Sequence, residues 1–293
     1  MIHTILITAY KNLSQLEQLV DFFEESSFRI YIHLDKKGRY DETVLERIKN
    51  KAQVQMLVQK YRVNWGGVNH LKAYLLLAQE ALLTESSSYF HLITGQDFPI
   101  VSKTKFLSFF SNQPEGKKKD YIKYVPLPNP NWHYGGGVDR LKYYHFYDVL
   151  DSKRHKRFIR KLVRLQKKMG LERSFSKSFP AMYGGSTYWS LTKESLSYVV
   201  NYTLQNPRYL KRFNYSFCAE EIYFQTLLCN SPLKNNMVNT NLRYIDWSKD
   251  RGSTPVVLDM RDYDKLAQSS CLFARKFDDE SSDLILKIKN RLW

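Results

Sequence analysis

Hydrophobic and polar positions alternate in blocks along the chain, and these blocks predict strands that are followed by helices. Apolar runs of strand length occupy residues 4–9, 28–34 and 89–94, whereas residues 13–23 and 70–83 place apolar side chains on one helical face. The same patterns predict further helices at residues 42–49, 153–168, 193–202, 219–228 and 282–292, and further strands at residues 54–57, 187–191 and 242–245.

The alternation of strands and helices indicates an α/β fold with a mostly parallel central sheet. A chain of 293 residues is long enough to bury a sizeable core in such a fold. Ligands of these sheets bind beyond the carboxyl ends of the strands. Asp35 and Asp97 follow two of the predicted strands, so we expect both at the ligand-binding edge.

Two adjacent carboxylates, Glu220 and Glu221, stand at the start of a predicted helix. Glutamate at a helix start interacts favourably with the helix dipole, and this capping role accounts for the pair without any chemistry. A carboxylate that faces a cleft can instead act as a general base. Spacing alone favours the capping role, and both interpretations stay open at this point.

Arg275 and Lys276 form a pair of cations near the C-terminus, and Arg251 is a further cationic candidate. Fixed cations, or a divalent metal, can stabilise the charge on a departing diphosphate, although most such side chains are simply solvated. The one Asp-x-Asp motif, Asp262 and Asp264, does not follow a clear strand, and we interpret it as the first turn of a helix. We therefore expect neither a metal nor a cofactor.

The charge of the chain is strongly positive, at +16, which favours an anionic partner. Nine Lys and Arg residues lie within residues 153–168, interleaved with apolar residues at helical spacing. This pattern is typical of helices that lie on anionic membranes, and a solvated helix face is the alternative. No nucleic-acid-binding motif accompanies the charge, so we expect no nucleic acid partner.

Few cysteines and the absence of a long apolar run suggest where the protein acts. Cys218, Cys229 and Cys271 show no metal-type spacing and fit a reducing compartment. The sequence has neither an apolar run of about 18 residues nor a recognisable signal peptide. We expect a cytoplasmic protein that can lie at the inner face of the cell membrane.

Several segments, taken in order, resemble one known family. The most specific are residues 91–100, His-Leu-Ile-Thr-Gly-Gln-Asp-Phe-Pro-Ile, and residues 272–277, Leu-Phe-Ala-Arg-Lys-Phe. The other matching segments are residues 5–10, 32–35 and 242–247, Trp65-Gly66, Gly185-Ser186, Tyr188-Trp189 and Glu220-Glu221. Together they resemble the core-2/I-branching β-1,6-N-acetylglucosaminyltransferase family, which includes peptide O-xylosyltransferases.

The resemblance implies a GT-A fold and sugar transfer with inversion and without a metal. It implies that Glu221 is the catalytic base and that Arg275 and Lys276 neutralise the donor diphosphate. It further implies that Ala9, Tyr10, Asp35 and, more weakly, Arg251 lie at the nucleotide, and that Trp65, Asp97, Ser186, Trp189, Glu220, Arg140 and Lys142 lie at the transferred sugar or the acceptor.

We therefore expect an inverting, metal-independent glycosyltransferase that moves GlcNAc, Gal or Xyl from a UDP-sugar to a hydroxyl of an oligosaccharide or lipid-linked glycan. The family's animal members carry a membrane anchor and disulfides, so this chain looks like a bacterial member that acts in surface polysaccharide synthesis. We predict one domain over residues 1–293, with a nucleotide-binding half at about 1–115, a basic insertion at about 116–180 and an acceptor-binding, catalytic part at about 181–293.

Two other functions remain open on the sequence. The chain could be a basic protein that binds nucleic acid or an anionic membrane without catalysis. It could also be a metal-dependent glycosyltransferase that uses Asp262 and Asp264.

Overall fold

The structure is a computed structural model that describes residues 1–83, 87–113, 118–176 and 178–292. Residues 116, 117 and 177 of the predicted basic insertion lie outside the described residues.

A seven-stranded sheet forms the centre of the molecule, with the strand order β10-β6-β9-β4-β1-β2-β3. The four strands at one side of this sheet are mutually parallel, whereas β9 runs antiparallel to both β4 and β6. The strands are β1 (Ile2–Ala9), β2 (Phe28–Leu34), β3 (Val54–Val58), β4 (Ser87–Thr94), β6 (Asp120–Ile122), β9 (Trp189–Thr192) and β10 (Met237–Val238). The predicted α/β fold with a mostly parallel sheet is confirmed.

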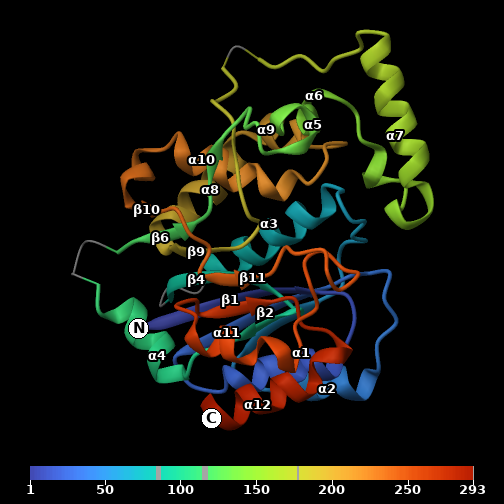
Figure 1. Ribbon diagram of the computed structural model, residues 1–293. Helices are drawn as coiled ribbons and strands as arrows, with labels where there is room; N and C mark the ends of the chain where they lie inside the picture. The colour runs from blue at the N-terminus through green and yellow to red at the C-terminus, as the bar shows by residue number, and fades with distance from the viewer. Residues whose placement is uncertain (84–86, 114–117, 177, 293) are drawn as a thin grey trace.

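Helices cover both faces of the sheet (Figure 1). One face is covered by α1 (Leu13–Phe22), α2 (Glu42–Lys49), α11 (Tyr263–Gln268) and α12 (Ser282–Leu292), and the other by α3 (Asn69–Leu82), α8 (Lys193–Gln205) and α10 (Tyr223–Cys229). Each layer has its own apolar core, because parallel strands that are buried on both faces must present apolar side chains to both. The remaining helices and helical turns are α4 (Lys103–Ser111), α9 (Pro207–Arg212), η1 (Phe146–Asp148), η2 (Ala219–Glu221), η3 (Pro232–Asn236), η4 (Met260–Asp262) and η5 (Asp279–Ser281).

A small second sheet joins distant parts of the sequence. Its strands are β11 (Arg243–Ile245), β12 (Phe273–Arg275) and β5 (Asp97–Pro99), in that order. The sequence pattern predicted β11 but neither β5 nor β12, and all three strands are only three residues long. A two-stranded ribbon, β7 (Val125–Pro126) and β8 (Tyr183–Gly184), lies elsewhere.

The middle of the chain forms α5 (His133–Gly136), α6 (Asp139–Lys142) and the long basic helix α7 (Ser152–Lys168). Helix α7 stands at the edge of the molecule, away from the sheet (Figure 1). Its Ile159 and Val163 are buried, and Gln166 exchanges two hydrogen bonds with the backbone of Tyr144. Within the described ranges, no helix combines the length and apolarity that a membrane span requires.

Candidate active site

The carboxyl ends of three parallel strands meet at one edge of the main sheet. The backbone N–H of Asp35 donates to the carbonyl oxygen of Ala9 at 2.9 Å, and Gly95 donates in the same way to Thr8 at 3.0 Å. The exposed Tyr10 follows β1, and its hydroxyl donates to Gln96 at 3.3 Å. Three of the residues that were predicted to lie at the nucleotide, Ala9, Tyr10 and Asp35, therefore share this edge.

Asp35 is positioned by its own loop. Its Oδ1 accepts hydrogen bonds from the backbone N–H groups of Lys37 and Val63, both at 3.0 Å. The carboxylate is buried, and both bonds hold it at a fixed place beyond the end of β2.

The cation pair reaches the same edge through the small sheet. Strand β12 runs antiparallel to β5, and this register sets Arg275 opposite Asp97. The guanidinium of Arg275 donates to Thr94 Oγ1 at 2.7 Å and lies 3.5 Å from Asp97 Oδ2. Burial lowers the pKa of Lys276, and the charges of Lys11 and Arg275 lower it further, against the opposing effect of Asp278.

The acidic pair lies in the 3-10 turn η2, immediately before α10. The turn follows Cys218, whose backbone is left-handed at φ 49°. The side chain of Glu221 is 32% exposed and pairs with the guanidinium of Arg140. Burial and the charge of Glu220 raise the pKa of Glu221, whereas Arg140 opposes this rise. A raised pKa suits a group that must take up a proton during a reaction.

Glu220 differs from its neighbour because it is buried in a polar cluster. Its Oε1 lies 3.4 Å from Nδ1 of His70, and Nε2 of the same ring lies 2.7 Å from the Tyr74 hydroxyl. The two glutamates thus have different environments, and Glu221 is the more accessible one.

A buried tyrosine, Tyr188, connects the acidic pair with the cation pair. The guanidinium carbon of Arg275 lies 5.0 Å from the centre of the Tyr188 ring. Burial raises the pKa of Tyr188, Arg275 lowers it, and the charges of Asp97 and Glu221 raise it further. Arg275 and Glu221 therefore both lie close enough to act on one side chain, although they are 54 residues apart in sequence.

Two of the predicted sugar contacts, Trp65 and Ser186, lie next to residues that contact the segment 217–221. Trp65 is 57% exposed, and its ring centre lies 5.2 Å from that of Phe217. The next residue, Gly66, accepts a hydrogen bond from Cys218 at 2.9 Å and has φ +83°, and a side chain there would meet the Phe217 ring. On the other side, Ser186 follows Gly185, whose N–H donates to the Glu221 carbonyl oxygen at 2.8 Å.

The expectation that Trp189 lines the sugar cleft is wrong. Trp189 is fully buried in β9, and its ring packs at 5.1 Å from that of Phe224 in the core. Tyr188, which precedes β9, instead lies against Arg275, whose guanidinium carbon is 5.0 Å from its ring centre.

Two other predicted residues are engaged elsewhere. Arg251 donates to both carboxylate oxygens of Asp262 at 2.7 and 2.8 Å, and this hydrogen bonding raises its pKa. Asp262 ends the helical turn η4 directly before α11, where the first turn of a helix was predicted, and it accepts from the N–H of Asp259. Lys142 pairs with Glu172 at 2.8 Å. The ion pairs described for Arg251 and Lys142 thus connect neither of them with Glu221 or Arg275.

Four polar residues around the site were not predicted from the sequence: His70, Tyr74, Tyr188 and Arg243. Arg243 is buried, donates to the Leu92 carbonyl oxygen and lies 5.0 Å from the Tyr188 ring centre. Burial lowers the pKa of Arg243 to about 10. Tyr188 belongs to one of the segments that resemble the family, but no pattern in that segment separates it from Trp189.

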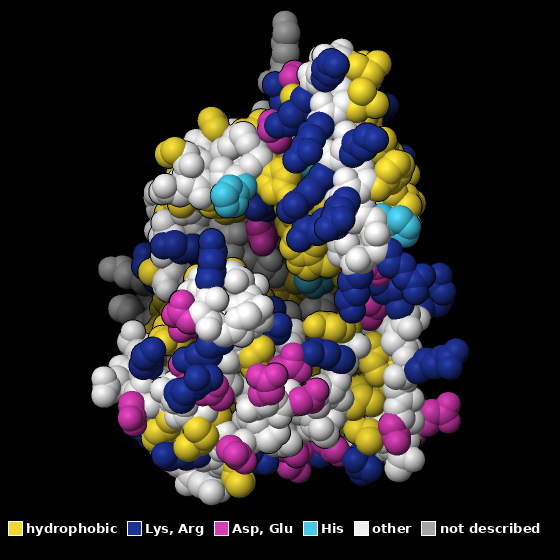
Figure 2. Space-filling model, turned by 45° about the vertical axis from the view of Figure 1, so that its right-hand side comes forward, with side chains coloured by type: hydrophobic (Ala, Val, Ile, Leu, Met, Phe, Trp, Pro, Cys, Tyr) yellow, Lys and Arg dark blue, Asp and Glu magenta, His cyan; other side chains and the backbone are white. Residues whose placement is uncertain are grey.

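Figure 2 shows that the surface is hollowed between the part that carries α7 and the body below it. Trp65 contacts the part that carries α7. Its ring centre lies 6.1 Å from that of Tyr147 and 5.8 Å from Nζ of Lys156 in α7.

Comparisons with known proteins identify the family. Residues 4–266 match the family described as "Branch: Core-2/I-Branching enzyme". The chain is 24% identical over 306 residues to xylosyltransferase 2 of Canis lupus familiaris, covering 97% of this chain and 32% of that protein. It is 24% identical over 293 residues to xylosyltransferase 1 of Homo sapiens, covering 94% of this chain and 28% of that protein. The chain thus spans about a third of the length of these curated relatives.

Among solved structures, the crystal structure of HddC from Yersinia pseudotuberculosis is 15% identical and covers 43% of this chain and 60% of that chain, with a TM-score of 0.27. That similarity is too small to support an argument. The family match, by contrast, extends over most of the sequence. This chain therefore belongs to the Core-2/I-Branching enzyme family, whose members are glycosyltransferases of the GT-A type.

Proposed function

We propose that this protein is an inverting, metal-independent glycosyltransferase that transfers a sugar from a UDP-sugar to a carbohydrate hydroxyl in surface polysaccharide synthesis. The observation that supports the proposal is that Glu221 and Arg275, far apart in sequence, both lie near Tyr188. A base and a cation that lie near one another suit a displacement in which the acceptor loses a proton while a diphosphate departs.

In this mechanism, Glu221 takes the proton of the acceptor hydroxyl as its oxygen attacks the anomeric carbon. The bond from that carbon to the UDP oxygen breaks, and Arg275 and Lys276 stabilise the negative charge on the departing diphosphate. An attack opposite to the leaving group converts an α-linked donor into a β-linked product. Arg140 holds the carboxylate of Glu221 in position.

The proposal of metal independence rests on the donor set near the site. Fixed cations can provide the stabilisation that a divalent ion provides in other transferases. Asp262, the first acid of the Asp-x-Asp motif, is fully buried, and both of its oxygens bond to Arg251. Its carboxylate therefore serves the fold, which favours the cation mechanism over one that uses Asp262 and Asp264.

The donor sugar is proposed to be GlcNAc, Gal or Xyl, and the named xylosyltransferases among the relatives support xylose. The test measures UDP release from UDP-GlcNAc, UDP-Gal, UDP-Xyl and UDP-Glc with and without EDTA. We expect UDP binding by calorimetry, and turnover of at least one donor that is unchanged by EDTA. No UDP binding would refute sugar transfer and favour a non-catalytic binding protein, whereas strict dependence on Mn²⁺ would refute the cation mechanism alone.

We also propose that α7 rests on an anionic membrane in a cytoplasmic enzyme with a lipid-linked or oligosaccharide acceptor. Phe158, Leu165 and Met169 are at least half exposed and recur at helical spacing, beside a row of Lys and Arg side chains along α7 (Figure 2). Each such cation contributes about 1 kcal/mol near an anionic surface.

Sedimentation with phosphatidylcholine vesicles, with and without phosphatidylglycerol, tests this contact. We expect binding to the anionic vesicles, and a clear loss of binding in the double variant Phe158→Ser/Leu165→Ser. The matched control replaces two exposed leucines of other helices, Leu204→Ser and Leu286→Ser, and should bind like the native protein. Equal sedimentation of both double variants would refute the contact.

A further inference from the structure

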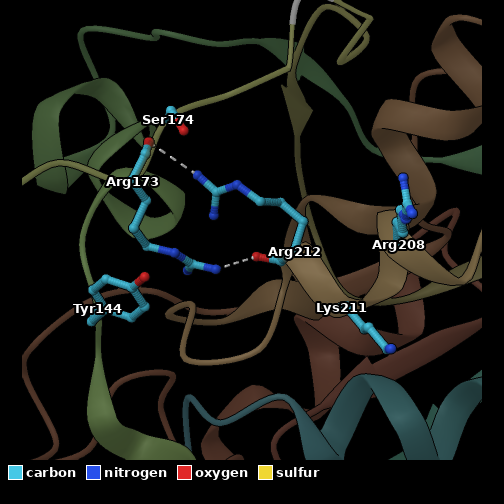
Figure 3. Close-up of a pocket in the computed structure, with 6 residues that line it drawn as sticks. All are labelled: Tyr144, Arg173, Ser174, Arg208, Lys211 and Arg212. Atoms are coloured by element: carbon cyan, nitrogen blue, oxygen red, sulfur yellow. Dashed lines mark hydrogen bonds between the residues drawn. The ribbon is translucent and has the colours of Figure 1, made fainter.

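A basic pocket lies beside the proposed active site. It is a hollow of about 340 Å³ that is lined by Tyr144, Arg173, Ser174, Arg208, Lys211 and Arg212. Figure 3 shows the side chains of Arg173 and Arg212 side by side and in opposite directions, each of them donating to the backbone carbonyl oxygen of the other. Arg208 and Lys211 come from α9 and are exposed.

The cations of this pocket lack a compensating carboxylate. In the described part of the chain, the ion pairs include none of Arg173, Arg208, Lys211 or Arg212. The two central guanidiniums bond to backbone carbonyls and to the Ser216 hydroxyl and stack on aromatic rings, and Nε of Arg212 is buried without a hydrogen-bond partner.

The carboxylate whose charge acts on Arg173, Asp148, already accepts hydrogen bonds from the backbone. The charge of Asp148 acts on Arg173, but its two oxygens accept hydrogen bonds from the N–H groups of Val68 and Tyr215 at 2.7 and 2.6 Å. Burial lowers the pKa of Arg212 to about 10, and the charge of Arg173 lowers it further. Like charges that are held together without a counter-charge favour the binding of an anion.

We propose that this pocket binds a phosphate or diphosphate group that belongs to the acceptor. Arginine forks and a lysine ammonium match phosphate oxygens, and a hollow of this size admits a diphosphate with part of the group to which it is attached. The aromatic ring of Tyr144, which is 44% exposed, offers an apolar side to the attached group.

Contacts of the pocket residues lead to Glu221, the proposed catalytic base. Arg212 donates to the carbonyl oxygen of Leu141 at 2.9 Å, and the residue before Leu141 is Arg140, which pairs with Glu221. On its other side, the backbone of Tyr144 is bonded to Gln166 of α7. An acceptor held by its phosphate would thus lie between the helix that we propose to be at the membrane and the carboxylate that deprotonates the sugar hydroxyl.

The binding site can be tested without turnover, by calorimetric titration of inorganic pyrophosphate into protein that is saturated with UDP. We expect one further binding event, weakened at least about tenfold in Arg208→Ala/Lys211→Ala, because this variant lacks two cations that can hydrogen-bond to phosphate oxygens. The exposed positions should leave the melting temperature unchanged. The charge-matched control Lys103→Ala/Lys105→Ala, on α4, should bind pyrophosphate normally. Equal affinity in both double variants would overturn the site.

The assignment to the acceptor rests on the proposed function and has its own test. With a prenyl-diphosphate-linked sugar as acceptor, Arg208→Ala/Lys211→Ala should raise KM about tenfold, whereas KM for the same sugar as a methyl glycoside should not change. If the variant instead loses binding to phosphatidylglycerol vesicles and keeps its KM, the pocket serves a lipid headgroup and the assignment is overturned. If UDP does not bind, the proposed function fails, while the dependence of pyrophosphate binding on Arg208 and Lys211 still decides the site.

Discussion

Two carboxylate–arginine pairs, Asp97 with Arg275 and Glu221 with Arg140, lie near Tyr188, and they differ in exposure and in the number of their partners. Asp97 is fully buried, and its Oδ2 accepts hydrogen bonds from the N–H and hydroxyl of Thr94 besides facing Arg275. Glu221 is one-third exposed, and Arg140 is the partner described for its carboxylate. The same pairing of charges thus fixes an arginine in one region and leaves a carboxylate accessible in the other.

The largest effect should follow from removing the accessible carboxylate. Glu221→Gln keeps a side chain of the same shape that can still accept from Arg140, but it cannot take up the acceptor proton. We expect turnover to fall about a thousandfold with unchanged UDP affinity. Steady-state kinetics and calorimetry measure the two quantities.

The neighbouring acid provides the control for that substitution. Glu220→Gln changes a buried residue that contacts His70, and we expect a much smaller loss of turnover. If the two variants lose turnover equally, or if Glu221→Gln stays active, Glu221 is not the base.

Replacing the buried carboxylate of Asp97 should lower the stability of the protein. In Asp97→Asn, the new amide nitrogen would occupy the position of Oδ1, which is buried without a hydrogen-bond partner, and the charge opposite Arg275 would be lost. We expect the free energy of unfolding to fall by about 2–3 kcal/mol. Urea denaturation compares this variant with Glu221→Gln, which should be as stable as the native protein. The reverse order of stabilities would contradict the division into a structural and a reactive carboxylate.

The sequence predicted the central sheet better than it predicted these pairs. Strands 28–34 and 89–94 were recognisable because continuous apolar runs of that length are typical of strands that are buried on both faces. The pairing of Arg275 with Asp97 depends on two strands of three residues each that are far apart in the chain, and no local pattern encodes it. Similarly, Arg140 was expected near the acceptor only by family resemblance, and its contact with Glu221 becomes visible in three dimensions.

The error at Trp189 has the same origin. The residues around it were predicted as a strand over 187–191, whereas β9 covers Trp189–Thr192, so Tyr188 lies just before the strand. The sequence does not show which of the two side chains enters the core, because both residues are large aromatics. The structure resolves this by packing Trp189 against Phe224.

A moderate effect on donor binding is expected from replacing Lys276, the residue that follows Arg275. Lys276 is partly exposed. Burial and nearby cations lower its pKa, which means that they destabilise its charged form. If it contacts the donor diphosphate, Lys276→Ala should weaken UDP binding about tenfold and leave uridine binding unchanged. Calorimetry with the two ligands measures this difference. Equal losses for UDP and uridine would indicate a structural role, and no loss for either would exclude Lys276 from the donor site.

The smallest effect should be a shift in the pH profile of kcat/KM when the pair of Glu221 and Arg140 is broken. Burial and Glu220 raise the pKa of Glu221, and Arg140 counteracts them. The base works when it is deprotonated, so kcat/KM should increase with pH through a pKa above the ordinary range of glutamate. Arg140→Met removes the counteracting charge, and the acidic limb should therefore move to higher pH. Arg140→Lys keeps a positive charge and should shift that limb less. Measurements across the acidic range with both variants decide the point, because an unchanged limb in Arg140→Met would mean that the titrating group is not Glu221.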